Sequence, residues 1–154
     1  MAQAIATMRR DRRRPMLRAS LATGNPSMLL ARIVLLIQIA ALVGLGLAYF
    51  IRPEEMTSLS GALLMSNAAV TEVRAYYGGL QLGLAAYLAM ALMRQDLLRP
   101  ALILLVLLYS VLALARIAGL WLDGGTQQTF NLYALLLEVV SAGLAWWALR
   151  GLSR

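Results

Sequence analysis

The chain contains no cysteine and no histidine, and none of its fourteen basic residues is lysine. Without cysteine there is no disulfide or thiol relay, and without histidine the usual zinc sites and His-ligated haem are excluded. An all-arginine set of basic residues indicates a genome rich in G and C rather than a particular chemistry. We therefore expect no metal and no cofactor.

Charge of either sign is scarce compared with apolar side chains. Hydrophobic residues make up 61% of the 154 residues, and the mean hydropathy is +0.73. So little polar surface cannot cover a water-soluble globule. Four apolar runs are each close to the roughly 20 residues that cross a hydrocarbon core, at residues 28–51, 68–93, 101–122 and 131–149. The sequence predicts an all-α integral membrane protein, with residues 28–154 as its membrane domain.

The arginines are distributed unevenly along the chain, and this predicts the orientation. Six of them lie in residues 1–27, which we interpret as an Arg-rich cytoplasmic arm that anchors to anionic lipid or sets topology rather than binding nucleic acid. Arg94, Arg99 and Arg150 fall on the same side of the predicted spans, whereas Glu54 and Asp123 fall on the other. By the positive-inside rule, both termini face the cytoplasm of a bacterial inner membrane that the chain crosses several times.

Short connections at residues 94–100 and 123–128 make consecutive helices antiparallel neighbours, so we expect an antiparallel four-helix bundle. The longer connection at residues 52–66 favours either a short amphipathic helix in the outer interface or an ordinary loop. Small residues at helical spacing drive close packing in lipid, within one bundle or between two copies. The glycines predicted to pack in this way are Gly44, Gly79, Gly83 and Gly119.

Two full charges lie inside apolar runs. Arg116 is about 9 Å below the outer end of its predicted helix, and Glu138 is about 10 Å below the start of the next one. Because residues 123–128 close these helices into a hairpin, the two side chains can meet as an ion pair. An ionisable group at such depth marks a functional site or a buried structural pair.

The run at residues 68–93 carries further polar groups. Glu72 and Arg74 are two positions apart and therefore point about 200° apart on a helix, and Gln81 at mid-helix favours the face of Arg74 as the inward one. The candidate cluster, with Gln38, Tyr109 and Asn131 as neighbours, is Glu72, Arg74, Tyr77, Gln81, Arg116 and Glu138. This cluster is interpreted either as the polar part of a ligand pocket or as a structural staple.

Two segments carry a family resemblance. The segments EVRAYYGGLQLG at residues 72–83 and ARIAG at 115–119, followed by an Asp-Gly turn and a Glu on the last helix, resemble the small bacterial membrane family named domain of unknown function 4345, which is similar in layout to DoxX-like four-helix proteins. The resemblance covers about residues 30–150 and supports the fold rather than a reaction. The residues that match the family pattern are Glu72, Arg74, Tyr77, Gly78, Gly79, Arg116 and Glu138.

Three functions remain open at this point. The first is a non-enzymatic membrane protein with an outer-leaflet pocket for a lipid or quinone. The second is an accessory subunit of a larger membrane complex. The third, a lipid-modifying isomerase or transferase that uses Glu138 as acid or base, is the least favoured, because a neighbouring Arg keeps a Glu ionised and no nucleophile or second acid converges on it.

Overall fold

The computed structural model describes residues 26–124 and 128–152, and every regular element within these ranges is helical. The predicted arm at residues 1–27 therefore lies outside the described residues except for its last two. The elements are α2 (Pro26–Ile51), α3 (Pro53–Ser58), α4 (Asn67–Val73), η1 (Arg74–Gly79), α5 (Leu80–Met93), α6 (Gln95–Asp123) and α7 (Thr129–Leu152).

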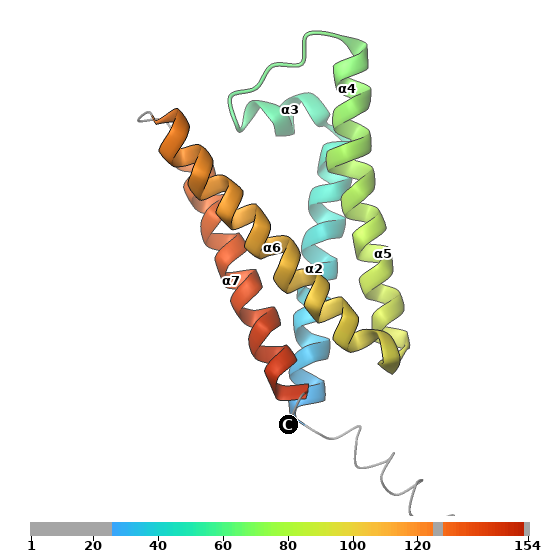
Figure 1. Cartoon of the computed structure of the whole chain (residues 1–154). Coiled ribbons are helices and arrows are strands. Elements are labelled where there is room, and N and C mark those ends of the chain that lie inside the picture. Colours follow the sequence, from blue (N-terminus) through green and yellow to red (C-terminus); the bar gives the residue numbers. More distant parts are fainter. Residues whose placement is uncertain (1–25, 125–127, 153–154) are drawn as a thin grey trace, which may run out of the picture.

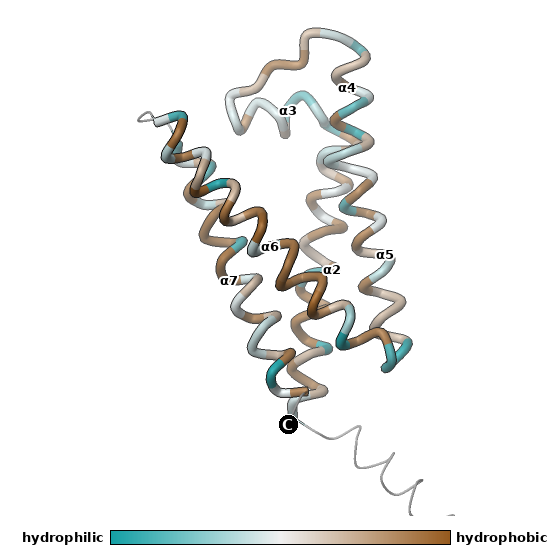
Figure 2. Tube along the Cα trace, viewed as in Figure 1, coloured by the Kyte–Doolittle hydropathy of each residue, from teal (hydrophilic) through white to brown (hydrophobic). Residues whose placement is uncertain are grey.

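Three helices, α2, α6 and α7, are long and apolar enough to cross a membrane. The 24 residues of α7 extend about 36 Å at about 1.5 Å per residue, which exceeds the hydrocarbon thickness of about 30 Å. Large apolar side chains cover their outer faces: Leu107, Leu114 and Leu137 are 60%, 65% and 66% exposed. Figure 2 shows this hydrophobic surface along α6. Such continuous exposure is unfavourable in water and suits lipid, as expected of a multi-pass membrane protein.

The run predicted at 68–93 forms one helical column from α4, η1 and α5, which lies beside α2 (Figure 1). Ser66 starts it, because its side chain accepts a hydrogen bond from the backbone N–H of Ala69 at 3.2 Å. The backbone stays helical at the junctions Arg74 and Leu80. Within η1 the pattern widens to a π-helix, with the N–H of Leu80 donating to the carbonyl of Ala75.

The connection between the second and third predicted runs is shorter than expected. Only Arg94, in an extended conformation, separates α5 from α6, which begins at Gln95. Arg94 pairs with Asp96 at 2.8 Å, and an acid suits the positive end of the helix dipole. Pro100, expected in the connection, is instead the sixth residue of α6, so one backbone N–H donor is missing from the helix there.

The outer connection at residues 52–66 contains one short helix, α3, of six residues. Pro53 at its first position and the acids Glu54 and Glu55 in its first turn favour this start. Gly61 adopts a positive φ of 80° just beyond it, which turns the chain away. Of the two alternatives for this connection, a short helix is present, and it ends at Ser58.

The buried core is confined to one end of the molecule, where α2 begins and α7 ends. It consists of Ala31, Val34, Leu35, Leu42, Ala85, Leu88, Ala91, Leu98, Ala101, Leu102, Leu105, Ala145 and Ala148. Toward the other end, the α6–α7 hairpin diverges from α2 and the α4–η1 column (Figure 1). We call this other end, which carries α3 and the α6–α7 turn, the splayed end.

Close contact between α2 and η1 depends on two glycines that were not singled out for packing. A Cβ atom on Gly46 would lie 3.0 Å from Cγ of Leu82, and one on Gly78 would lie 3.1 Å from backbone N and Cα of Phe50. Any side chain at Gly78 would therefore push α2 away from η1.

The four glycines predicted to pack helices do not do so within this chain. A Cβ atom on Gly44 or Gly83 would meet nothing within 4 Å, and one on Gly79 or Gly119 would approach only a residue of the same helical column. The physical reason is that the spacing of small residues identifies positions one turn apart along a helix. It does not determine which face of that helix turns toward the neighbouring helix. Where every face is apolar, the sequence leaves that rotation open.

Candidate functional site

Arg116 on α6 and Glu138 on α7 form an ion pair, as the sequence predicts. Nε of Arg116 donates to both carboxylate oxygens at 3.1 Å, and Nη2 donates to Oε1 at 2.8 Å. The Glu138 side chain is 9% exposed and that of Arg116 is 25% exposed. The carboxylate is therefore enclosed, whereas the arginine side chain remains a quarter exposed.

The hairpin brings these charges to similar depths. Arg116 lies seven residues before the end of α6 at Asp123, and Glu138 lies nine residues after the start of α7 at Thr129, which is about 10 and 13 Å respectively. Gly124, with a φ of 60°, ends α6 and lets the chain reverse. Each charge offsets the desolvation cost of the other.

Two amides extend the pair toward the turn. Nη1 of Arg116 donates to Oδ1 of Asn131 at 2.7 Å, and Nδ2 of Asn131 donates to Oε1 of Gln128. The amide of Asn131 is thereby oriented with its oxygen toward the guanidinium. All three nitrogens of Arg116 have a partner, so its position is fixed before any ligand arrives.

A second polar layer lies deeper and joins three helices. The Tyr109 hydroxyl donates to Oε1 of Gln38 at 2.6 Å, and Nε2 of Gln38 donates to Oγ of Ser141 at 3.0 Å. Gln38 is only 5% exposed, and Tyr109 also interacts electrostatically with Glu138. The sequence analysis named Gln38 and Tyr109 as neighbours but not Ser141, although its place three residues after Glu138 puts it on the same face.

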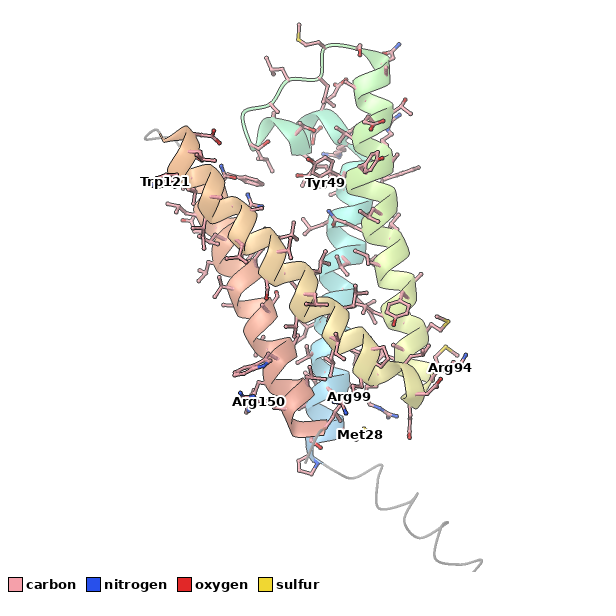
Figure 3. The ribbon with its side chains drawn as sticks, viewed as in Figure 1. Met28, Tyr49, Arg94, Arg99, Trp121 and Arg150 are labelled. Carbon is pink, nitrogen blue, oxygen red and sulfur yellow. The ribbon has the colours of Figure 1, made fainter. Side chains whose placement is uncertain are left out.

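An aromatic pair links η1 to this cluster. The rings of Tyr49 and Tyr77 are 5.3 Å apart at an interplanar angle of 30°, and Tyr49 interacts electrostatically with Arg116. Figure 3 places Tyr49 toward the splayed end, the same end as Trp121. Tyr77, a predicted site residue, thus approaches Arg116 through Tyr49.

Arg74 does not join the cluster as predicted. It is exposed, and its Nε donates to the backbone carbonyl of Phe50 at 3.1 Å, where a cation suits the negative end of the α2 dipole. Among the described residues, no hydrogen bond or ion pair connects Arg74 to Arg116. The π-helix explains the difference, because one extra residue in a turn shifts later side chains by about 100° relative to earlier ones.

Glu72 is also separate from the pair. It is exposed and lines an open groove of about 410 Å³ together with Val73, Tyr76, Tyr77 and Leu80. No hydrogen bond or ion pair connects it to another described residue. The groove is an apolar, aromatic surface with one carboxylate at its edge.

Gln81 has an unusual environment. Its Oε1 atom is buried and accepts no hydrogen bond, and it is the sole buried side-chain polar atom of that kind within residues 26–124 and 128–152. Buried polar atoms in native proteins nearly always have partners, so this one requires an explanation.

A family model described as a domain of unknown function, DUF4345, matches residues 30–149. The chain belongs to the DUF4345 family. The match includes every polar residue of the two layers, from Gln38 to Ser141. No curated protein and no solved structure matches the chain. DUF4345 carries no stated reaction, so function has to be argued from the site.

Proposed function

We propose that this DUF4345 protein is a non-enzymatic protein of the bacterial inner membrane that holds a small amphipathic molecule, a lipid or a quinone, in the outer half of a four-span bundle. The column at residues 67–93 supplies the fourth span beside α2, α6 and α7. Arg94, Arg99 and Arg150 lie at one end of the molecule (Figure 3). That distribution supports a cytoplasmic position for this end and for both termini.

The observation that carries the proposal is the position of the Arg116–Glu138 pair beyond the limit of the core. The packed cluster of α6 extends from Leu98 to Leu105, Ala113 is the last buried residue of this helix, and Arg116 lies three residues further toward the splayed end. A staple inside a closed bundle would need apolar packing around it to exclude lipid and water. Here the α6–α7 hairpin diverges from α2 and the α4–η1 column (Figure 1), and the pair lies outside the packed cluster, which supports a small molecule as its neighbour.

The partly exposed side chain of Arg116 indicates the polar part of that occupant. A guanidinium already paired with one carboxylate has spare N–H donors and favours an oxygen acceptor, such as a quinone carbonyl or a lipid phosphate. Tyr49 and Tyr77 offer flat surfaces beside it, which suit a ring or an acyl chain. Both ends of an amphipathic molecule therefore have a matching surface.

The geometry argues against the enzymatic alternative. Glu138 accepts three hydrogen bonds from Arg116, and such contacts occupy its lone pairs. A general base needs a lone pair within reach of substrate. A carboxylate enclosed in this way acts as a fixed counter-ion that holds Arg116 in place.

Gentle extraction followed by native mass spectrometry tests the proposal. The wild-type protein should retain a small amphipathic molecule, and the double variant Arg116→Leu/Glu138→Leu should lose it while staying folded. Arg99→Leu, which removes an exposed arginine at the opposite end, is the matched control and should retain it. Retention by the double variant would contradict the pocket. A bound protein chain in place of the small molecule would instead favour an accessory subunit.

A further inference from the structure

Glu72 is an acid inside the proposed fourth span that has no partner of its own. It lies five residues after Asn67, where the column at residues 67–93 begins, which is about 8 Å along the helix axis. Every other acid among the described residues either pairs with an arginine or lies in a connection or at a helix end. An unpaired charge within a span is costly. Glu72 therefore favours a cation from outside the chain.

An aromatic and apolar groove lies beside this carboxylate. Its volume is about 410 Å³, and its lining residues are Glu72, Val73, Tyr76, Tyr77 and Leu80. The side chains of Tyr76, Tyr77 and Leu80 are all more than half exposed, so a molecule in the surrounding membrane can reach the groove directly. The groove thus combines one negative charge with two aromatic rings and an apolar floor.

The π-helix explains why Tyr77 lines the same groove as Glu72. The two residues are five positions apart, and an α-helix would place Tyr77 about 140° around the axis from Glu72. In a π-helix the hydrogen bonds join residues five apart, which reduces that angle. Because η1 covers the positions from Arg74 onward, both Tyr76 and Tyr77 lie near the carboxylate. Single π-helical turns of this kind are frequent at functional sites.

We propose that this groove binds an outer-leaflet phospholipid with an ammonium headgroup, such as phosphatidylethanolamine. Glu72 pairs with the ammonium group, and the faces of the tyrosine rings attract the same cation. Leu80 lies eight residues further along the column, about 12 Å closer to the membrane centre, where it contacts the acyl chain. A phospholipid without an amine would bring only its phosphate against Glu72 and is therefore disfavoured.

This site goes beyond the proposed pocket beside Arg116. The charges of the two sites have opposite sign: Arg116 favours an oxygen acceptor, whereas Glu72 favours a cation. No hydrogen bond or ion pair connects Glu72 to the Arg116–Glu138 pair within the described residues. The inference depends on the membrane position of the column at residues 67–93, and it does not depend on which molecule lies beside Arg116.

Two phospholipids that differ only in the amine test the inference on the full-length protein in nonionic detergent. Dioleoyl phosphatidylethanolamine carries the ammonium group, and dioleoyl phosphatidylethanol has the same chains and ethyl headgroup without it. A photoreactive phenylalanine analogue at Leu80 is irradiated in an equimolar mixture of both, and mass spectrometry measures the two adducts. The ethanolamine adduct should exceed the other by about 3- to 30-fold, which is the combined effect of one exposed ion pair and one cation–π contact.

Overall charge works against this preference, because the net charge of +7 attracts the anionic phosphatidylethanol. Glu72→Gln in the same photoreactive chain should remove the excess of the ethanolamine adduct, and Tyr76→Leu should reduce it. Glu54→Gln is the matched control: it removes an exposed acid of α3 that lies outside the groove, and it should keep the excess. The analogue at Leu107, exposed on α6, should show no excess.

Equal adducts at position 80 would overturn the inference, as would an excess of the ethanolamine adduct that survives in Glu72→Gln. A cross-linked protein chain in place of a lipid would also overturn it. If the analogue at Leu80 prevents folding, the same comparison is made with the analogue at Val73, which also lines the groove. Each of these results is independent of whether a molecule binds beside Arg116, so the proposed function is tested separately.

Discussion

Replacing one residue of the Arg116–Glu138 pair and replacing both residues should reduce the free energy of unfolding by clearly different amounts. Removing one partner of a buried ion pair costs about 3–5 kcal/mol, because the other charge is left without compensation. The two partners differ in exposure, at 25% for Arg116 and 9% for Glu138. In Glu138→Leu, the unpaired Arg116 also keeps its hydrogen bond to Asn131. We therefore expect Arg116→Leu to lie at the upper end of that range and Glu138→Leu at the lower end.

The double variant should recover much of this loss, since two leucines leave no uncompensated charge in the low-dielectric interior. If the single losses are about 5 and 3 kcal/mol, additivity would give about 8 kcal/mol, whereas we expect the double variant to lose no more than about 3 kcal/mol. The coupling free energy is then about 5 kcal/mol, which is large for residues in direct contact.

Reversible unfolding in mixed micelles, with increasing sodium dodecyl sulfate, measures these free energies for the wild type and the three variants. Arg99→Leu controls for the loss of one positive charge and should change the unfolding free energy little, because exposed arginines contribute little to stability. If the double variant loses as much free energy of unfolding as the sum of the two single variants, the two sites are not coupled. That result would refute the reasoning from the buried pair.

Three further predictions follow from particular contacts. Gly78→Leu should destabilise the fold by about 1–3 kcal/mol because the new side chain meets the α2 backbone, whereas Gly44→Leu, which meets open space, should be close to neutral in the same unfolding assay. Tyr109→Phe should cost about 1 kcal/mol by leaving the Gln38 oxygen unbonded, and wild-type stability in this variant would show that the deeper polar layer does not contribute. Topology reporters fused after Gln95 and after Gly124 should read cytoplasmic and periplasmic respectively, and the same signal from both would contradict the four-span arrangement.

Charge and apolar run length made the main features of this fold predictable from sequence. The meeting of Arg116 and Glu138 followed from two opposite charges at equal depth on helices joined by a short turn. That argument needed no knowledge of how the helices rotate, because a buried charge in lipid strongly favours contact with its counter-ion.

Features that depend on helix rotation were not predictable in the same way. The π-helix at Arg74–Gly79 changes which residues share a face, so Arg74 caps α2 instead of facing the pair. Close packing involves Gly46 and Gly78 rather than Gly44. Gly44 and Gly46 both lie on apolar faces of the same helix, so the spacing of small residues does not show which of them faces the neighbouring helix. The sequence also gave no sign that Oε1 of Gln81 lacks a partner, because that depends on the hydrogen bonds of residues far away in the chain.

The central claim is that a small amphipathic molecule occupies the space beside Arg116, and photo-crosslinking in intact cells tests it most directly. A photoreactive phenylalanine analogue replaces Tyr49, whose ring packs on Tyr77 and which interacts electrostatically with Arg116, and in a control chain it replaces Leu107, which is 60% exposed on α6. Mass spectrometry of the irradiated protein should show one discrete small-molecule adduct at position 49 and a mixture of bulk membrane lipids at position 107. The same lipid mixture at both positions, or a cross-linked protein chain at position 49, would contradict the account.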